Sequence, residues 1–402
     1  MYNKKFKIKN NVLIKYKGKD DCVVIPDGVK EIGSRCFEYN LKIKSVVFPD
    51  SVERICTQAF LGCENIESIT LNNGLKLIGD FAFFMNTNLK KVVFPSTLLK
   101  IENNAFRDCL NLEEVKFNKN LKYIGTQAFE NCGCLKNVYI PRKTKLGSAV
   151  FPNSDIKEFT FGNRDYKVVE NCLYSRKHKT LLMSFAGGEV NVCDGTKKIK
   201  NWAFKGKYKI SIPKSVKDFG CYHILHEHLK FNSDNSRFVQ IDNCIFDTKK
   251  NRLVQSWGTK NLAIDNIKII GEDSLGFLRN CSTIRICEGV TKIEKAAMSA
   301  NLNTKVFTVP STVKKISIDA FSLSLKLEKI IFTQGVRKID FTDFYGVLYP
   351  KLRYIQIPPS VKSLKGYNEE MKNITIICRK NSCAYRYAKK NKLKFNIMDD
   401  EL

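Results

Sequence analysis

The sequence lacks the features that would place it in several familiar functional classes. None of its 402 residues belongs to an apolar run of 18, so no segment is long and apolar enough for a membrane-spanning helix. It contains no H-E-x-x-H, G-x-S-x-G, P-loop or G-x-G-x-x-G motif, and its carboxylates are scattered without a recurring pair. We therefore expect a protein without catalytic activity, without a cofactor and without membrane insertion.

Acidic residues and arginine are both in short supply. Asp and Glu number 40 against 68 Lys and Arg, which gives a net charge of +28, and only 14 of the 68 basic residues are arginine. A strongly basic chain is typical of nucleic-acid binding, but phosphate and base recognition favours the bidentate fork of arginine. Two interpretations follow: a solvated lysine coat that aids solubility, or a face that binds a polyanion such as nucleic acid or a sulfated glycan.

The strongest signal in the sequence is an internal repeat of 23 residues. Apolar residues recur at this spacing in several parallel columns over residues 23–140. Three of the columns are Ile25, Phe48, Leu71, Phe94, Phe117 and Ile140; Ile32, Ile55, Ile78, Ile101 and Ile124; and Phe37, Phe60, Phe83, Phe106 and Phe129. The period returns near the C-terminus, where Ile286, Val309 and Phe332 again lie 23 residues apart.

Each unit predicts one strand followed by a compact turn. The spacing Ile43-x-x-Val46-x-Phe48 alternates as in a short strand, and the proline that often follows ends it. In Ile32-x-x-x-Cys36-Phe37 the apolar residues lie on one face of a helical turn. One unit cannot bury its own apolar side, so the units must stack into a solenoid rather than form several globular domains.

Two segments interrupt the period and resemble each other. Residues 171–185 and 243–257 match at an offset of 72 and predict β-hairpins, with short apolar strands around a polar turn. Val12–Tyr16 resembles a third copy of the same element. We expect these segments to be hairpins inserted in the repeat array.

The fifteen cysteines fit the repeat better than a disulfide framework. No C-x-x-C pair occurs, and Cys63, Cys109 and Cys132 share one column of the repeat. Cys36 lies immediately before Phe37 of the Phe column, at the place where the other units have alanine. A column that accepts Ala or Cys is a small buried slot, so we expect free, buried thiols.

The repeat resembles a known family. Its pattern, Ile-Pro-x-x-Val-x-x-Ile-Gly-x-x-Ala-Phe-x-x-Cys-x-x-Leu, is similar to the consensus of the BspA-like leucine-rich repeats, and it is clearest in residues 94–112 and 48–66. Residues 374–391 resemble the closing segment of that family, a strand and a short helix for which Ser382 is a suitable N-cap. The resemblance implies an α/β repeat solenoid, curved and right-handed, with a parallel sheet on the concave face.

The resemblance also bears on function and location. Members of the family are known as surface proteins with adhesive repeats, which implies a protein–protein interaction, adhesin-like role. The first ten residues carry lysines where a signal peptide needs an apolar segment, so the sequence itself predicts a cytoplasmic location. Display at the cell surface or secretion is the alternative that the family implies, and we expect a monomer with a protein partner.

The outward-facing strand positions are the candidate binding surface. In the first array this face becomes basic towards its end and places an aromatic residue beside cations, a combination suited to docking a partner. The same face should continue in the second array. The predicted partner-binding residues are Lys116, Lys119, Tyr139, Arg142, Lys143, Arg285 and Tyr354.

One histidine cluster is a weaker candidate for a metal site. His223, His226 and His228 lie within six residues, and imidazoles so close could converge on one zinc ion. Their spacing lacks the two paired ligand sets of a structural zinc site. The repeat places His223 at the position where other units have alanine, and it places His226 and His228 on the polar side of the turn. The preferred interpretation is therefore that no metal is bound.

The sequence divides into seven expected segments. They comprise an N-terminal cap, a first repeat array, a hairpin insert, degenerate repeats, a second hairpin insert, a second array and a C-terminal cap. Their boundaries are 1–22, 23–158, 159–189, 190–230, 231–262, 263–366 and 367–402.

Overall fold

The computed structural model describes two compact units, residues 1–205 and 206–402, and each is considered by itself. The residues that it describes are 5–176, 179–185, 188–204, 208–220, 229–231, 235–257, 261–276, 278, 281–299, 301, 303–344 and 349–398. Among them, no helix has the length and apolar character needed to cross a bilayer.

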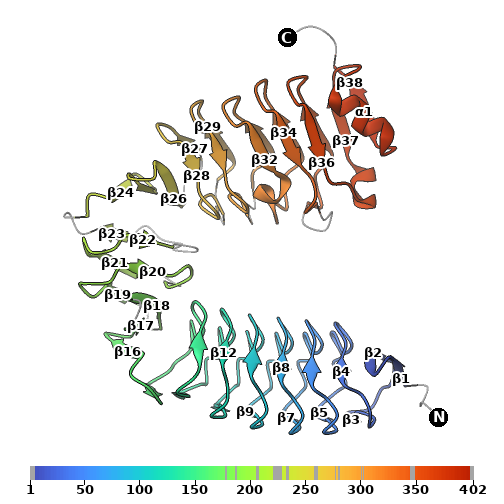
Figure 1. The fold of residues 1–402 in the computed structure, drawn as a ribbon, viewed down its shortest axis with the longest axis vertical. Helices are drawn as coiled ribbons and strands as arrows, with labels where there is room; N and C mark the ends of the chain where they lie inside the picture. The colour runs from blue at the N-terminus through green and yellow to red at the C-terminus, as the bar shows by residue number, and fades with distance from the viewer. Residues whose placement is uncertain are drawn as a thin grey trace. The chain divides into compact units, whose positions relative to one another are not determined.

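The first unit is a parallel β-solenoid whose coils are 23 residues long (Figure 1). Every coil contributes one strand to each of two parallel sheets, in register with the coils before and after it. One sheet contains β3 (Cys22–Val24), β5 (Ser45–Val47), β7 (Ser68–Thr70), β9 (Lys91–Val93) and β11 (Glu114–Lys116). The other contains β4 (Glu31–Ile32), β6 (Arg54–Ile55), β8 (Leu77–Ile78), β10 (Lys100–Ile101), β12 (Tyr123–Ile124) and β14 (Lys145–Leu146). Next in the chain, β13 (Asn137–Ile140) pairs in parallel with β15 (Glu158–Phe161).

In the described coils of the first unit, the helical turn expected after the second strand is absent. Its place is taken by tight turns whose backbone bonds to the next coil: the N–H groups of Phe37, Phe60 and Phe83 each donate to a carbonyl one coil further on, at 2.8 Å. The chain is therefore a β-solenoid with little helix. The expected α/β alternation fails because these turns satisfy their hydrogen bonds between coils instead of within a helix.

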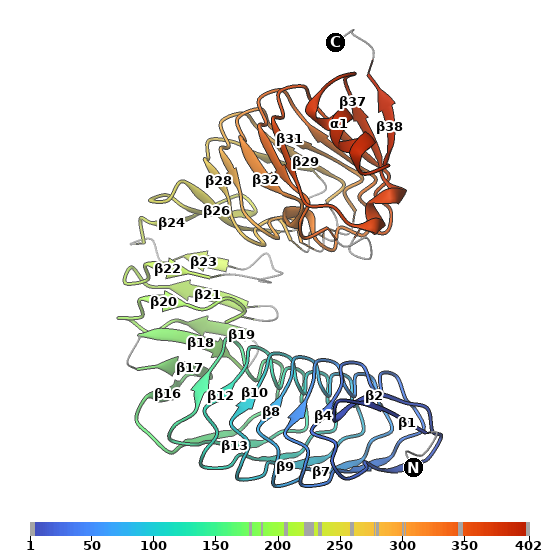
Figure 2. The same cartoon turned by 45° about the vertical axis from the view of Figure 1, so that its right-hand side comes forward.

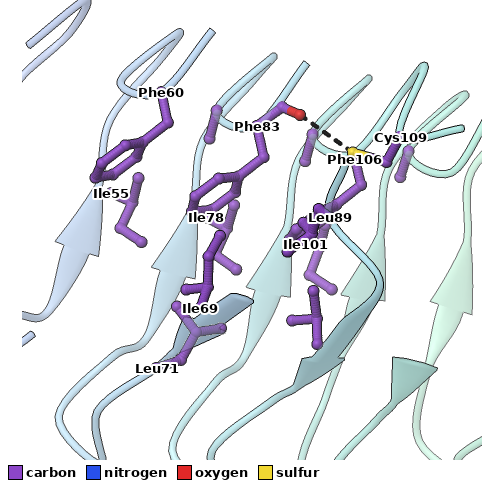
Figure 3. Packing of buried hydrophobic residues seen from close by; sticks show 14 of the residues in the cluster. Ile55, Phe60, Ile69, Leu71, Ile78, Phe83, Leu89, Ile101, Phe106 and Cys109 are labelled. Atoms are coloured by element: carbon purple, nitrogen blue, oxygen red, sulfur yellow. Dashed lines mark hydrogen bonds between the residues drawn. The ribbon is translucent and has the colours of Figure 1, made fainter. Parts of the chain in front are cut away.

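The apolar columns of the sequence form the core of the first unit. The Phe column is fully buried and its rings stack, with centroids 4.6 Å apart for Phe37 and Phe60 and 5.2 Å apart for Phe60 and Phe83. Figure 3 shows this column above the column of Ile55, Ile78 and Ile101. Equivalent side chains of successive coils thus touch each other, and the coils are held together by contacts that repeat along the stack.

The cysteine column has a role beyond filling a small slot. Cys63 Sγ donates to the carbonyl of Phe37 at 2.9 Å, and Cys109 Sγ donates to that of Phe83 at 3.3 Å (Figure 3). The same position is occupied by Asn86, whose Nδ2 donates to Phe60, and by Ser154, whose Oγ donates to Phe129. The column therefore selects a small hydrogen-bond donor. Burial raises the pKa of the Cys63 thiol to about 12, so it remains protonated and able to donate.

The expectation of free thiols is confirmed for the described residues, and that of burial is confirmed for most of them, whereas Cys22 is exposed and Cys56, Cys134, Cys193, Cys287 and Cys383 are partly exposed. Every cysteine among them is a free thiol. The buried ones are Cys36, Cys63, Cys109, Cys132, Cys172, Cys244, Cys281 and Cys378.

Three antiparallel hairpins precede runs of parallel strands. In the first unit, β1 (Phe6–Lys9) pairs with β2 (Val12–Tyr16), and β16 (Tyr166–Val169) pairs with β17 (Cys172–Ser175), which pairs with β18 (Thr180–Ser184). The first unit ends with β19 (Gly188–Asn191) and β20 (Lys198–Ile199), and β20 pairs with β18 in parallel. The third hairpin lies in the second unit and contains β24 (Phe238–Ile241), β25 (Cys244–Asp247) and β26 (Arg252–Ser256). In all three, the last strand pairs with a short parallel strand of the next coil, so the hairpin starts a ladder.

The second unit repeats the same design around its own core. It begins with β21 (Tyr208–Ile212), β22 (Asp218–Phe219) and β23 (Leu229–Phe231). After the hairpin, one face carries β27 (Asn261–Ile264), β29 (Thr283–Ile286), β31 (Val306–Val309), β33 (Lys329–Phe332), β35 (Tyr354–Ile357), β37 (Thr375–Cys378) and β38 (Lys394–Ile397). The other carries β28 (Ile269–Ile270), β30 (Lys292–Ile293), β32 (Lys315–Ser317), β34 (Lys338–Asp340) and β36 (Ser363–Lys365), with 3-10 turns at Ile318–Phe321 and Glu369–Asn373.

A helix closes the second unit. α1 (Cys383–Lys390), the one α-helix among the described residues, lies beside β37 and β38 (Figure 2). Ser382 caps it as predicted, because its hydroxyl accepts from the N–H of Tyr385 at 3.2 Å. Ala384 and Ala388 are buried against the last coil, and Lys389 and Lys390 occupy the favourable end of the helix dipole.

Candidate protein-binding face

The candidate surface is the solvent side of strands β3, β5, β7, β9, β11 and β13, which we call the ladder face. Strand alternation creates it: Val46, Val92 and Val138 point into the core, while the residue after each of them points outward. The outward row is Val24, Val47, Thr70, Val93, Lys116 and Tyr139. Val24 is 63% exposed and Tyr139 is 52% exposed, so large apolar groups here face solvent without a partner in the unit.

A second row of the ladder face alternates in charge. The residues just before the strands are Asp21, Lys44, Glu67, Lys90, Glu113 and Lys136, all exposed. Neighbouring strands in a sheet are about 4.8 Å apart, so like charges in this row would repel each other and the alternation removes that repulsion. With three acids and three bases, the row has no net charge. The excess of lysine over acidic residues therefore gives this row no net positive charge.

A third row, in the turns after the strands, changes sign along the stack. It runs Asp27, Asp50, Asn73, Ser96, Lys119 and Arg142. Lys143 follows Arg142, and all three basic residues are exposed. Lys119, Arg142 and Lys143 have no ion-pair partner in the part of the chain that the structure describes. The ladder face is thus acidic at its beginning and basic at its end, as the sequence predicted for the basic end.

Lys116 is a weaker candidate for binding a partner than the other predicted residues, because its charge is neutralised by a neighbour. Glu114, on the same strand, lies 2.6 Å from the ammonium of Lys91 and 3.0 Å from that of Lys116. The hydrogen bonds from Lys91 and then Lys116 hold the pKa of Glu114 below its ordinary value, so the carboxylate stays ionised. The charge of Lys116 is therefore countered within the face, whereas those of Lys119 and Arg142 are available.

The Tyr139 hydroxyl and the backbone of Arg142 both lie close to Gly162 in the next coil. A Cβ atom at Gly162 would lie 2.7 Å from the Tyr139 hydroxyl and 2.7 Å from the backbone nitrogen of Arg142. Both distances are too short for any side chain, so glycine at this position lets the Tyr139 ring extend over the neighbouring strand. Gly162 is not among the residues predicted from the sequence.

The predicted residues Arg285 and Tyr354 belong to the second unit. Arg285 is exposed in β29 and pairs with Ala263, while Tyr354 is 44% exposed in β35 between Lys329 and Thr375. Tyr354 lies two residues before Gln356, in a different outward row from Thr308, Ile331 and Gln356. The structure therefore groups Lys116, Lys119, Tyr139, Arg142 and Lys143 in one unit and places these two residues in the other.

The histidine cluster lies outside the described residues. His223, His226 and His228 all fall in the interval 221–228, so their predicted positions stay untested. Among the described residues, no three His, Cys, Asp or Glu side chains are placed to hold a metal ion.

Comparison with known proteins identifies the repeat. The model of the BspA-type leucine-rich repeat region matches residues 30–157 and 250–374, in six copies. Among solved structures, a leucine-rich cell surface protein of Faecalibacterium prausnitzii is 18% identical, with a TM-score of 0.42, over 93% of this chain and 97% of that chain. The pneumococcal vaccine antigen PcpA is 16% identical, with a TM-score of 0.47, over 99% and 98% of the two chains.

A third solved structure of the same kind is a leucine-rich repeat protein of Bacteroides ovatus. It is 19% identical, with a TM-score of 0.39, over 96% of this chain and 87% of that chain. No curated protein matches the sequence. Since the repeat model matches more than half of the residues, the chain belongs to the BspA-type leucine-rich repeat family.

Proposed function

We propose that this protein is a non-catalytic binding protein whose ladder face docks a partner protein in an adhesin-like role. The observation that supports this most is the end of the face, which exposes Tyr139 together with the cations Lys119 and Arg142, neither of which has an ion-pair partner among the described residues. Tyrosine and arginine together are typical of the residues that dominate binding energies. The partner that fits is a protein with an acidic segment near an apolar contact.

The change in sign along the turn row gives the partner a direction. Asp27 and Asp50 at one end and Lys119 and Arg142 at the other favour a segment whose own charge runs the opposite way. Like charges brought together at either end would disfavour the reversed orientation. Charge thus fixes the orientation of the partner, and the exposed valines between the ends supply apolar contact.

The test is the double substitution Tyr139→Ala with Arg142→Ala. Binding to a panel of purified extracellular-matrix and cell-surface proteins is measured by surface plasmon resonance for the parent and the variant. We expect at least a tenfold weaker affinity for the partner that the parent binds, with an unchanged melting temperature. The matched control is Tyr39→Ala with Arg35→Ala, the same residue types exposed on the turn side of the same unit. Equal losses in both variants would reject the ladder face.

An adhesin-like role also requires display outside the cell. Fractionation of native cells, with detection of the protein in cytosol, envelope and medium, tests this part of the proposal. Recovery at the surface or in the medium supports it. Recovery in the cytosol alone would confine the proposal to an intracellular protein partner.

A further inference from the structure

A cleft lies at the end of the sheet that contains β4 to β14, away from the ladder face. It has a volume of about 770 Å³ and lies between β14, the hairpin strands β16 to β18, and β20. Its lining includes Lys145, Leu146, Tyr166, Leu182, Lys198 and Lys200. This volume is in the range of sites that hold small ligands, roughly 300–1,000 Å³.

The cleft exists because the ladder misses one strand. β14 pairs with β12 and is the last strand of its sheet, so the polar groups on its other edge need partners. Tyr166 supplies them: its hydroxyl accepts from the N–H of Leu146 and donates to the carbonyl of Thr144, both at 3.2 Å. The Tyr166 side chain thus closes the backbone edge, and the space beside it stays open as the cleft.

The cleft is positively charged. Among the described lining residues are three lysines and one carboxylate, that of Asp165, and Lys198 and Lys200 are half-buried. Lys145 and Lys200 have no ion-pair partner within the described residues. Some lysines elsewhere in this unit do have one, as in the pairs Lys76–Glu53, Lys100–Glu102 and Lys136–Asp155. Unpaired cations inside a walled cleft concentrate positive potential there.

We propose that this cleft binds the sulfate groups of a sulfated oligosaccharide. Three ammonium groups can each donate to sulfate oxygens, and a flexible lysine side chain adapts to the varied spacing of sulfates on a sugar chain. Leu146 and Leu182 provide apolar lining for the carbon face of a sugar ring. The site is independent of the ladder face and of its protein partner.

The lining favours a glycan over nucleic acid. The lining residues that the structure describes include no arginine to read phosphate or a base edge with a bidentate fork. The aromatic ring, Tyr166, is half-buried and its hydroxyl is already bonded to the backbone of Thr144 and Leu146, so it offers no open platform for stacking a base.

The test uses a heparin-derived hexasaccharide and isothermal titration calorimetry at physiological salt. We expect the parent protein to bind it and to bind its unsulfated counterpart at least tenfold more weakly. The triple variant Lys145→Gln, Lys198→Gln, Lys200→Gln should lose at least tenfold in affinity, whereas the corresponding Arg triple should keep most of it. Melting temperatures of both variants check that the fold is retained.

A control triple removes the same charge elsewhere in the unit. Lys9→Gln, Lys30→Gln, Lys42→Gln changes three exposed lysines outside the cleft and outside the ladder face, and should leave the affinity within twofold of the parent. Equal losses in the cleft and control triples would overturn the proposal and assign binding to the general excess of lysine. Failure of the parent to bind the hexasaccharide, or tighter binding of a single-stranded oligonucleotide of equal charge, would overturn it as well.

Discussion

At the scale of single residues, the left-handed backbone positions explain how the coils differ from helices. Arg35, Gln58, Phe81, Asn104 and Gln127 occupy one position of successive coils, and all have φ between 56° and 59°. This conformation costs an ordinary residue about 1–2 kcal/mol. Each of these N–H groups donates to a carbonyl of the next coil, at 2.9 to 3.3 Å, which offsets the cost. The neighbouring coil therefore decides the local conformation.

The donor column provides a prediction about a buried thiol. Cys109 Sγ donates to the carbonyl of Phe83 and accepts from the N–H of Asn86. Cys109→Ala should lower the free energy of unfolding by about 1–2 kcal/mol, because a buried carbonyl loses a donor. Cys109→Ser should cost less, since Ser154 fills the same role in its own coil. Urea unfolding of the two variants measures this, and an equal cost for both would contradict the donor role.

A second residue-scale prediction concerns Asp273. Burial, helped by the charge of Glu272 and opposed by that of Lys295, raises the pKa of this carboxyl from 3.8 to about 7. The folded chain then holds a proton that the unfolded chain releases, so this group's contribution to stability is complete below about pH 4 and is lost as the pH rises to 7.

Asp273→Asn removes this dependence without changing the backbone. Asp273 has φ of 51°, a value that asparagine adopts readily. The variant should melt at a higher temperature than the parent at pH 8 and at nearly the same temperature at pH 4. Thermal melts across this range test it, and a constant difference at all pH values would assign the effect to packing instead.

At the scale of the structural element, the stacked Phe column is the main link between coils. The Phe106 ring is stacked between Phe83 and Phe129, at 5.1 and 5.3 Å, and lies edge-on to Phe94 at 5.6 Å. Phe106→Ala should cost about 3–5 kcal/mol, since it leaves a cavity and removes contacts with both neighbouring coils. Val93→Ala, on the exposed ladder face, should cost far less. Denaturant unfolding of both measures the difference, and similar costs would contradict the assigned register.

The strands and the core could be predicted from the sequence because both depend on local periodicity. Ile32, Val46 and Phe60 lie where the 23-residue period places them, buried in the stack. The turns could not be predicted, because the N–H groups of Phe37 and its equivalents bond to backbone atoms one coil away. A pattern of six residues carries no information about a partner so far along the chain. For the same reason the sequence predicted Lys116 and Tyr139 on one face but gave no indication of Gly162 or of the ion pair to Glu114.

At the scale of the whole molecule, the described residues of each unit form an apolar core of their own. The cluster in the first unit extends from Leu13 to Met183, and the cluster in the second extends from Cys244 to Leu393. We therefore expect two calorimetric transitions. Phe106→Ala should lower the midpoint temperature of one transition. Phe321→Ala, which removes a fully buried ring edge-on to Phe307, should lower the midpoint temperature of the other. If both variants shift a single common transition, the two cores unfold as one unit.

The fixed length of the coil also determines how many residues can be inserted into or deleted from the chain without disturbing the stack. In the second unit the offset between paired strands grows to 25 residues, from Lys329 to Tyr354, and the strands still pair in register because the extra residues lie between them. Small insertions are thus absorbed in the turns, while a larger change must add or remove a complete coil. Excision of residues 64–86 would bring Phe60 next to Phe106 with every column still aligned. A gene for this protein can therefore lengthen or shorten by recombination between its own repeats, and each product remains a stackable chain.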